Sequence, residues 1–139
     1  MNRRLRVGLV SFAHVHAPAL ASTLRGLEHV EFTGIHDEDP ARGRAAVKEH
    51  GARWHETLDG LLAASEAVVI ASTNFDRRRY TEAAAAKGVH VLSEKPLATT
   101  VVDGRAMIEA CRRAGVQLGV AFPVRSSLHS LACGRNSAS

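Results

Sequence analysis

Short apolar runs alternate along the chain with longer segments of mixed polarity. The runs at Leu5–Val10 and Ala67–Ala71 are apolar almost throughout, which is typical of strands buried on both faces of a sheet. Weaker runs of the same kind predict further strands at residues 30–35, 52–55, 89–92 and 116–121.

Proline and glycine mark the ends of the segments between these runs. Pro18 precedes a predicted helix over residues 19–27, and Pro40 opens a second helix that Gly51 closes. Further helices are predicted at residues 58–64, 78–87 and 100–114, the last two followed by glycine. Buried strands separated by helices predict an α/β fold with a doubly wound parallel sheet, a Rossmann-like arrangement.

The chain of 139 residues is long enough for one domain with a substantial core. We assign residues 1–125 to this Rossmann-like domain. Residues 126–139 are rich in serine and small side chains without a clear period, so we predict an irregular tail there.

Composition excludes several classes of function. Apolar residues make up 45% and charged residues 23% of the chain, as in an ordinary globular protein. We expect a cytoplasmic protein without a membrane partner, because no apolar stretch approaches the roughly 18 residues of a membrane span and the start lacks a signal peptide. The net charge of +4 is dispersed, so no nucleic-acid binding is expected, and two cysteines are too few for a disulfide framework.

Polar residues that could bind a ligand or take part in catalysis cluster where predicted strands end, in segments 11–16, 36–39, 72–77 and 93–96. Ligands of open α/β sheets bind at the carboxyl ends of the strands, beside the point where the strand order reverses. We therefore expect the site at this edge. Its candidate cofactor-binding residues are Ser11, Phe12, Ala13, His14, His16, Asp37, Ser72, Thr73, Asn74, Glu94 and Pro96.

The first of these segments stands where a dinucleotide-binding fold carries G-x-G-x-x-G. Here Ser11, Ala13 and His16 replace the three glycines. Serine suits the tight turn only at negative φ, and the Ala13 methyl points to where a pyrophosphate would approach. His16 and His14 could face a phosphate at a helix N-terminus or serve a purely structural role. Two histidines without a visible third ligand make a poor zinc site, so no metal is predicted.

Asp37 follows the second predicted strand, 21 residues after His16. An acid at this point accepts hydrogen bonds from an adenosine ribose, although a helix-capping role would explain it equally well. The neighbouring Glu38 and Asp39 would repel a 2′-phosphate. The expected cofactor is therefore NAD, with NADP as the alternative because arginines at 42 and 44 follow closely.

The segment Ser93–Pro96 closes a buried strand with serine, an acid, an amine and a proline. Lys95 can exchange a proton with a carbonyl or alkoxide, which makes it the candidate catalytic residue. Glu94 could orient the lysine or bind a ribose hydroxyl, and Pro96 would fix the turn.

Taken together, these segments resemble the N-terminal domain of the glucose–fructose oxidoreductase/inositol dehydrogenase (Gfo/Idh/MocA) family. The resemblance runs from Arg6 to about Arg125 and rests on RVGLVSFAHVHA, GIHDEDPARG, AVVIASTN, GVHVLSEKPLATT and GVQLGVAFPVR. It implies an NAD(P)-dependent oxidoreductase acting on a sugar, cyclitol or related alcohol. By position, Lys95 is similar to the catalytic lysine of the family, and Asp37, Asn74 and Glu94 match cofactor-side positions.

The chain also departs from the family pattern. The glycines are replaced, and Arg77 stands where many members have histidine. No substrate domain follows, so the resemblance implies a truncated chain with little turnover by itself. A Rossmann-like domain that normally packs against a substrate domain would, without it, expose an apolar face around Val120–Val124 and self-associate through that face. A non-catalytic Rossmann-like module that binds a nucleotide or a partner is the alternative function.

Overall fold

A computed structural model describes residues 3–94 and 98–121 of the chain. Five strands form one parallel sheet in the order β2-β1-β3-β4-β5. They are β1 (Leu5–Val10), β2 (Val30–His36), β3 (Ala67–Ile70), β4 (His90–Glu94) and β5 (Leu118–Ala121). The α/β class predicted from the sequence is confirmed, and the strand order reverses between β1 and β3.

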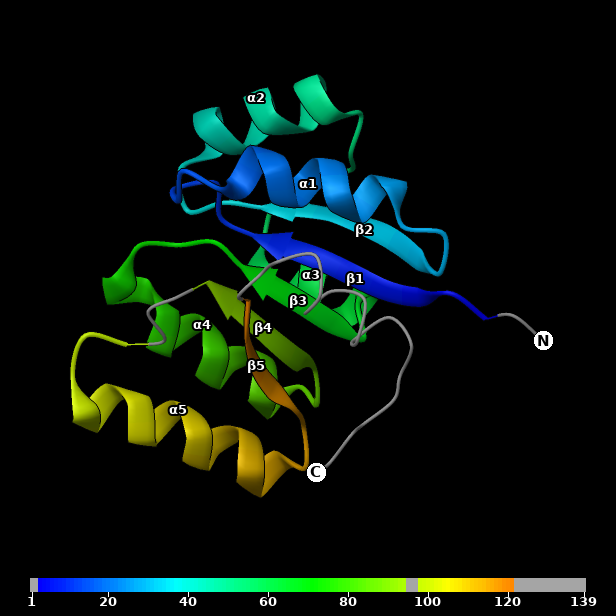
Figure 1. Ribbon diagram of the computed structural model, residues 1–139. Coiled ribbons are helices and arrows are strands. Elements are labelled where there is room, and N and C mark those ends of the chain that lie inside the picture. The colour runs from blue at the N-terminus through cyan, green and yellow to red at the C-terminus, as the bar shows by residue number, and fades with distance from the viewer. Residues whose placement is uncertain (1–2, 95–97, 122–139) are drawn as a thin grey trace.

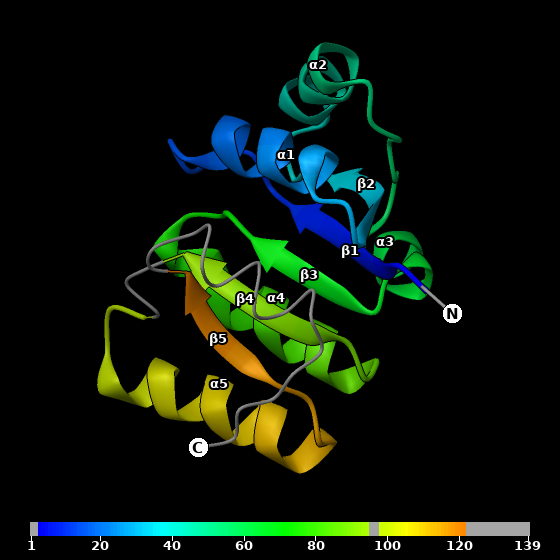
Figure 2. The same ribbon diagram turned by 45° about the vertical axis from the view of Figure 1, so that its right-hand side comes forward.

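Helices cover both faces of this sheet (Figures 1 and 2). Apolar side chains of α1 (Ala17–Gly26) pack against one face of β1, together with Ala46 of α2 (Pro40–His50). The opposite face carries α3 (Leu58–Ala64), α4 (Asn74–Ala86) and α5 (Val101–Ala114), packed around Val10, Val68 and Ile70. The sheet is therefore a buried layer, which explains the apolar strands.

Local signals set most of the helix ends. The Asp39 side chain accepts hydrogen bonds from the backbone N–H groups of residues 41 and 42, and Gly51 ends α2 in the left-handed conformation at φ 61°. Thr57 and Thr100 cap α3 and α5 in the same way as Asp39. The predicted Leu58–Ala64 helix is confirmed at both ends.

Two predicted elements differ from the structure by more than two residues at an end or in kind. The strand predicted at 52–55 is wrong: this segment makes only an isolated bridge between Trp54 and Ile35. Helix α4 begins at Asn74 rather than near Arg78, because Thr73 has the extended backbone of a helix-capping residue. Part of the segment expected as a loop therefore belongs to the first turns of a helix.

A bulge lies at the centre of β2, and the end of this strand reaches the carboxyl edge of the sheet. The register between β1 and β2 shifts between Val7 and Gly8, which pair with Phe32 and Gly34. Gly34 has φ +133°, which few residues other than glycine adopt. The Ile35 N–H, next along the strand, donates to the carbonyl of Arg53 at 2.8 Å. The bulge thus fixes the direction of the residues that lead to Asp37.

Among the described residues, none of the helices combines the length and the hydropathy that crossing a bilayer requires.

Candidate functional site

The described parts of the four polar segments, residues 11–16, 36–39, 72–77 and 93–94, meet at the carboxyl edge of the sheet, beside the reversal between β1 and β3. The loop after β1 is held against the end of β3 by a hydrogen bond from the His14 N–H to the Ala71 carbonyl, at 2.9 Å. An open hollow of about 350 Å³ lies between this loop and the start of α4. It is lined by Ala13, His14, Val15, Ser72, Thr73, Asn74 and Arg77.

Ser11 adopts φ 76°, so the negative φ that the sequence analysis required for serine is wrong. The turn is therefore left-handed at its first residue. The Ser11 Oγ accepts a hydrogen bond from the Ala13 N–H at 3.1 Å, which holds the turn closed. The left-handed conformation costs a non-glycine residue about 1–2 kcal/mol. The loop therefore carries a strained residue at the first position of the fingerprint.

Asp37 is buried and both of its carboxylate oxygens are occupied. They accept hydrogen bonds from the backbone N–H groups of Phe12 and Asp39, both at 2.9 Å, and from Arg42 Nε and an Arg42 terminal nitrogen at 2.8 and 2.7 Å. Burial alone would raise the pKa of Asp37, but these hydrogen bonds, led by Arg42, hold it below its ordinary value. Asp37 thus ties the first loop to α2, a connection that the sequence did not reveal; Asp39, not Asp37, caps the helix.

Glu38 completes this acidic side of the site. Its carboxylate accepts hydrogen bonds from Arg42 at 2.8 Å and from the buried Tyr80 hydroxyl at 2.7 Å. Arg42 is therefore shared between two carboxylates, and Arg44 pairs with Glu56 at 3.0 Å. Both arginines that the sequence offered for a 2′-phosphate are thus paired with acids in this structure.

Ser72 and Thr73 lie at the end of β3, and Asn74 begins α4. Ser72 is fully buried, and its carbonyl accepts a hydrogen bond from Arg77 at 3.4 Å. Arg77 is 1% exposed, although it is charged. Burial lowers the pKa of Arg77, and the negative charge of Glu94 partly opposes the change. Arg77 was noted in the sequence only as a departure from a family pattern, and the structure places it in the wall of the hollow.

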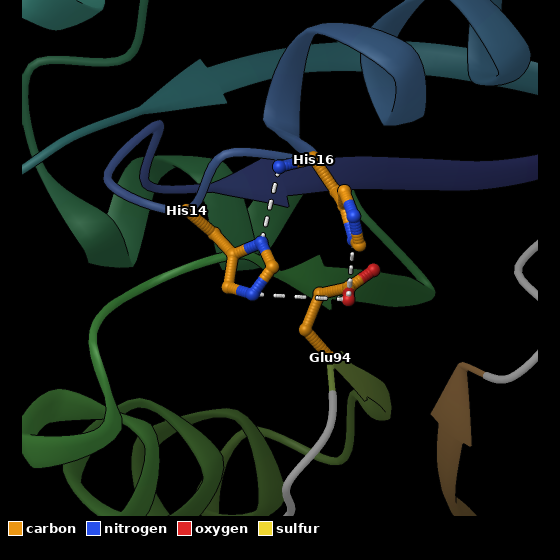
Figure 3. Close-up of side chains that lie close together, drawn as sticks. All are labelled: His14, His16 and Glu94. Carbon is orange, nitrogen blue, oxygen red and sulfur yellow. Dashed lines mark hydrogen bonds and ion pairs between the residues drawn. The ribbon is translucent and has the colours of Figure 1, made fainter.

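Glu94 is the most informative residue of the edge. It is 2% exposed at the end of β4, and its Oε1 lies 3.2 Å from His16 Nδ1 and 4.0 Å from His14 Nε2 (Figure 3). Its Oε2 is buried without a hydrogen-bond partner among the described residues. Leaving a buried carboxylate oxygen unsatisfied costs about 1–3 kcal/mol or more. An acceptor of this kind is suited to a ligand that brings a donor or a cation.

The two histidines differ in their surroundings. The side chain of His16 is 60% exposed, whereas that of His14 is 21% exposed. Burial lowers the pKa of His14, and so do the nearby charge of Arg77 and the neighbouring His16, while Glu94 acts in the opposite direction. His16 projects from the loop toward Glu94 and does not pack between α1 and the sheet. The buried side chains of α1 begin at Ala17, the next residue. Glu94 is a third side chain that could ligate a metal beside the two histidines, and the sequence alone did not reveal it.

Several predicted residues fall outside the described part of the chain. Lys95 and Pro96 belong to the gap at residues 95–97, and the predicted tail lies beyond residue 121. Of the apolar face predicted around Val120–Val124, residues 122–124 also lie beyond the described range. Val120 itself is 38% exposed.

A family model described as an oxidoreductase family with an NAD-binding Rossmann fold, GFO_IDH_MocA, matches residues 4–122 of this chain. The chain belongs to the Gfo/Idh/MocA oxidoreductase family. The family resemblance seen in the sequence is confirmed.

Relatives within the Gfo/Idh/MocA family include enzymes of sugar chemistry. Glucose-6-phosphate 3-dehydrogenase of Bacillus subtilis is 30% identical over 119 residues, which cover 86% of this chain and 33% of that protein. The 1,5-anhydro-D-fructose reductase of Ensifer adhaerens is 47% identical over 89 residues, which cover 62% of this chain and 27% of that protein.

A solved structure of GenD2 from gentamicin A biosynthesis, in complex with NAD, is 28% identical. It superposes with a TM-score of 0.77 and covers 85% of this chain and 34% of that one. The chain therefore spans about a third of the length of the relatives it matches.

Proposed function

We propose that this chain binds NAD across the carboxyl edge of its sheet, as the nucleotide-binding part of an oxidoreductase that transfers hydride between the cofactor and a sugar, cyclitol or related alcohol or ketone. The observation that carries the proposal is the convergence of residues 11–16, 36–39, 72–77 and 93–94 at the carboxyl edge beside the β1/β3 reversal, in a chain of the Gfo/Idh/MocA family. NADP is the alternative cofactor. A cytoplasmic location and self-association remain predictions from the sequence.

The residues of this edge fit NAD in part. The unsatisfied Oε2 of Glu94 offers a buried acceptor to a ribose hydroxyl. Asp37 offers none until Arg42 moves aside, because both of its oxygens are occupied. Ala13 lines the hollow where the second glycine of the fingerprint would stand. We therefore expect this site to bind the dinucleotide more weakly than a site whose loop keeps all three glycines.

When bound, NAD supplies a hydride acceptor at its nicotinamide ring. The chain's own groups would position it, with Glu94 accepting a hydrogen bond from a ribose hydroxyl. The N–H groups of Phe12, Ala13, His14 and His16 already donate within the protein, so the phosphates would face chiefly the positive end of the α1 dipole. Lys95 would exchange a proton with the substrate oxygen, a role that the family resemblance implies. Glu38 and Asp37 place negative charge where a 2′-phosphate would lie, which favours NAD over NADP.

The proposal is tested by titrating the chain with NADH and NADPH while following nicotinamide fluorescence and calorimetric heat. We expect saturable binding with NADH preferred by at least about 5-fold, equivalent to roughly 1 kcal/mol. The Ala13→Gly variant should bind NADH about 5-fold more tightly still, because the lost methyl lets the backbone approach the pyrophosphate.

Ala19→Gly is the matched control. Ala19 is exposed on α1, so the variant adds a glycine without opening the loop and should leave the affinity unchanged. No binding at millimolar NADH by either the wild type or Ala13→Gly would reject the proposal. The non-catalytic module that binds a partner would then explain the chain better, and the replacement of all three glycines is the feature that favours it.

A further inference from the structure

Three side chains from distant parts of the sequence converge at the mouth of the site. His14 and His16 come from the loop after β1, and Glu94 ends β4 (Figure 3). Each offers one ligand atom, and these atoms all lie within 4.8 Å of one another. Among the residues that the structure describes, this is the one group of three or more histidine, cysteine or acidic side chains close enough to hold a metal ion.

The donor set matches the chemistry of a transition-metal ion. Two imidazole nitrogens and a carboxylate oxygen form the three-ligand set of open zinc sites, in which the fourth position is left to water or another ligand. The carboxylate is 2% exposed, and its second oxygen has no hydrogen-bond partner among the described residues. A cation bound at Oε1 would offset the cost of burying this charge, and bidentate contact would also satisfy Oε2.

We propose that His14, His16 and Glu94 bind a divalent transition-metal ion, with Zn²⁺ as the reference ligand. Donor atoms around a tetrahedral zinc ion lie roughly 3.3–3.5 Å apart, given bonds of about 2.0–2.2 Å. The separation of 3.2 Å between His16 Nδ1 and Glu94 Oε1 already meets this requirement. The other separations, 4.0 Å between His14 Nε2 and Glu94 Oε1 and up to 4.8 Å within the group, must shorten by roughly 0.5–1.5 Å.

Metal binding changes the hydrogen bonding of His14 in a defined way. The backbone N–H of His16 donates to His14 Nδ1 at 3.1 Å, so the proton of the neutral ring sits on Nε2. Coordination through Nε2 moves that proton to Nδ1, and the contact with the His16 N–H is lost. This hydrogen bond is exposed and its net worth is about 1 kcal/mol, much less than a zinc–nitrogen bond contributes.

The open position of the ion would be reached from the hollow, because His14 also lines its wall. The ion would join the loop after β1 to the end of β4, two elements whose ligands are 78 residues apart in the sequence. The proposal concerns the binding of metal alone and does not rest on the binding of NAD.

The test is a calorimetric titration of the full chain with Zn²⁺, repeated with Co²⁺ to record the visible absorption of a tetrahedral site. We expect one ion per chain with a micromolar or tighter dissociation constant. His16→Ala should weaken binding by about 100-fold or more, since removing even an outer-shell partner costs 10–100-fold. His29→Ala is the control, because His29 is exposed on a turn and should leave the affinity within about 2-fold.

Two further measurements keep the result decisive. Glu94→Gln should weaken zinc binding while keeping the shape of the side chain. If that variant does not fold, nitrogen-15 spectra of the wild-type imidazoles serve instead: zinc should move the His14 proton from Nε2 to Nδ1. Absence of binding at millimolar zinc, equal affinity in His16→Ala and the wild type, or an unchanged His14 tautomer would overturn the proposal.

Discussion

Replacing Asp37 with asparagine is expected to lower the free energy of unfolding by about 3 kcal/mol at neutral pH. The carboxylate accepts four hydrogen bonds, and its side chain is 0% exposed. An amide keeps one acceptor oxygen and turns an N–H₂ group toward the Arg42 guanidinium. The first loop and α2 both lose an anchor, so urea denaturation followed by circular dichroism should show an earlier midpoint with an unchanged slope.

The pH dependence of this effect has a definite sign. The folded-state pKa of Asp37 lies below its unfolded value, so its contribution to stability is fully present above the unfolded pKa, near pH 4. The contribution is lost as the pH falls through the folded pKa. The difference between the wild type and Asp37→Asn should therefore shrink in acid. Asp59→Asn, at an exposed position in the first turn of α3, should cost less than about 1 kcal/mol; an equal loss in both variants would contradict this account of Asp37.

Gly34→Ala is expected to have the larger effect, a loss of at least about 4 kcal/mol in the free energy of unfolding, measured by urea denaturation. Two causes add: φ of +133° is strained for any residue with a Cβ, and that Cβ would lie 2.4 Å from the Arg53 carbonyl oxygen. Because a backbone atom cannot yield as a flexible side chain does, the bulge must open. The end of β2, and Asp37 with it, should then lose its position.

Substitutions at two other glycines distinguish the strain of a positive φ from the clash of the added Cβ. Gly88 has φ +73° with nothing near its added Cβ, so Gly88→Ala should show the conformational cost alone, about 1–2 kcal/mol. Gly26 has neither a positive φ nor a close neighbour, and Gly26→Ala should be neutral or slightly stabilising. A Gly34→Ala variant no less stable than Gly88→Ala would mean that the bulge does not need glycine.

The parts of the fold that could be predicted are those with local causes. Pro40 and Gly51 mark the ends of α2, and unbroken apolar character identifies β3, because each signal acts within a few residues. The start of α4 was missed because Thr73 and Asn74 are compatible with a loop as well as with a helix start. The segment at 52–55 has the composition of a strand, but it pairs with β2 at Trp54 only.

The candidate site could be predicted in position but not in its contacts. The carboxyl edge follows from the parallel topology, and it brings Asp37 and Glu94 to the places expected. The bidentate pairing of Asp37 with Arg42 depends on the orientation of α2. The meeting of His16 with Glu94 joins residues 78 apart, which sequence spacing does not reveal. The left-handed backbone of Ser11 could not be predicted, because residues other than glycine rarely adopt a positive φ.

The most direct test of dinucleotide binding at the carboxyl edge is to map NADH onto the chain by backbone amide chemical shifts. We expect saturable shifts confined to segments 11–16, 36–39, 72–77 and 93–94, at the carboxyl edge. The contrasting surface is the hollow of about 430 Å³ lined by Ser22, Arg25, Gly26, Glu49 and His50. Shifts centred there, or no shifts at millimolar NADH, would contradict the assignment of the carboxyl edge as the dinucleotide site.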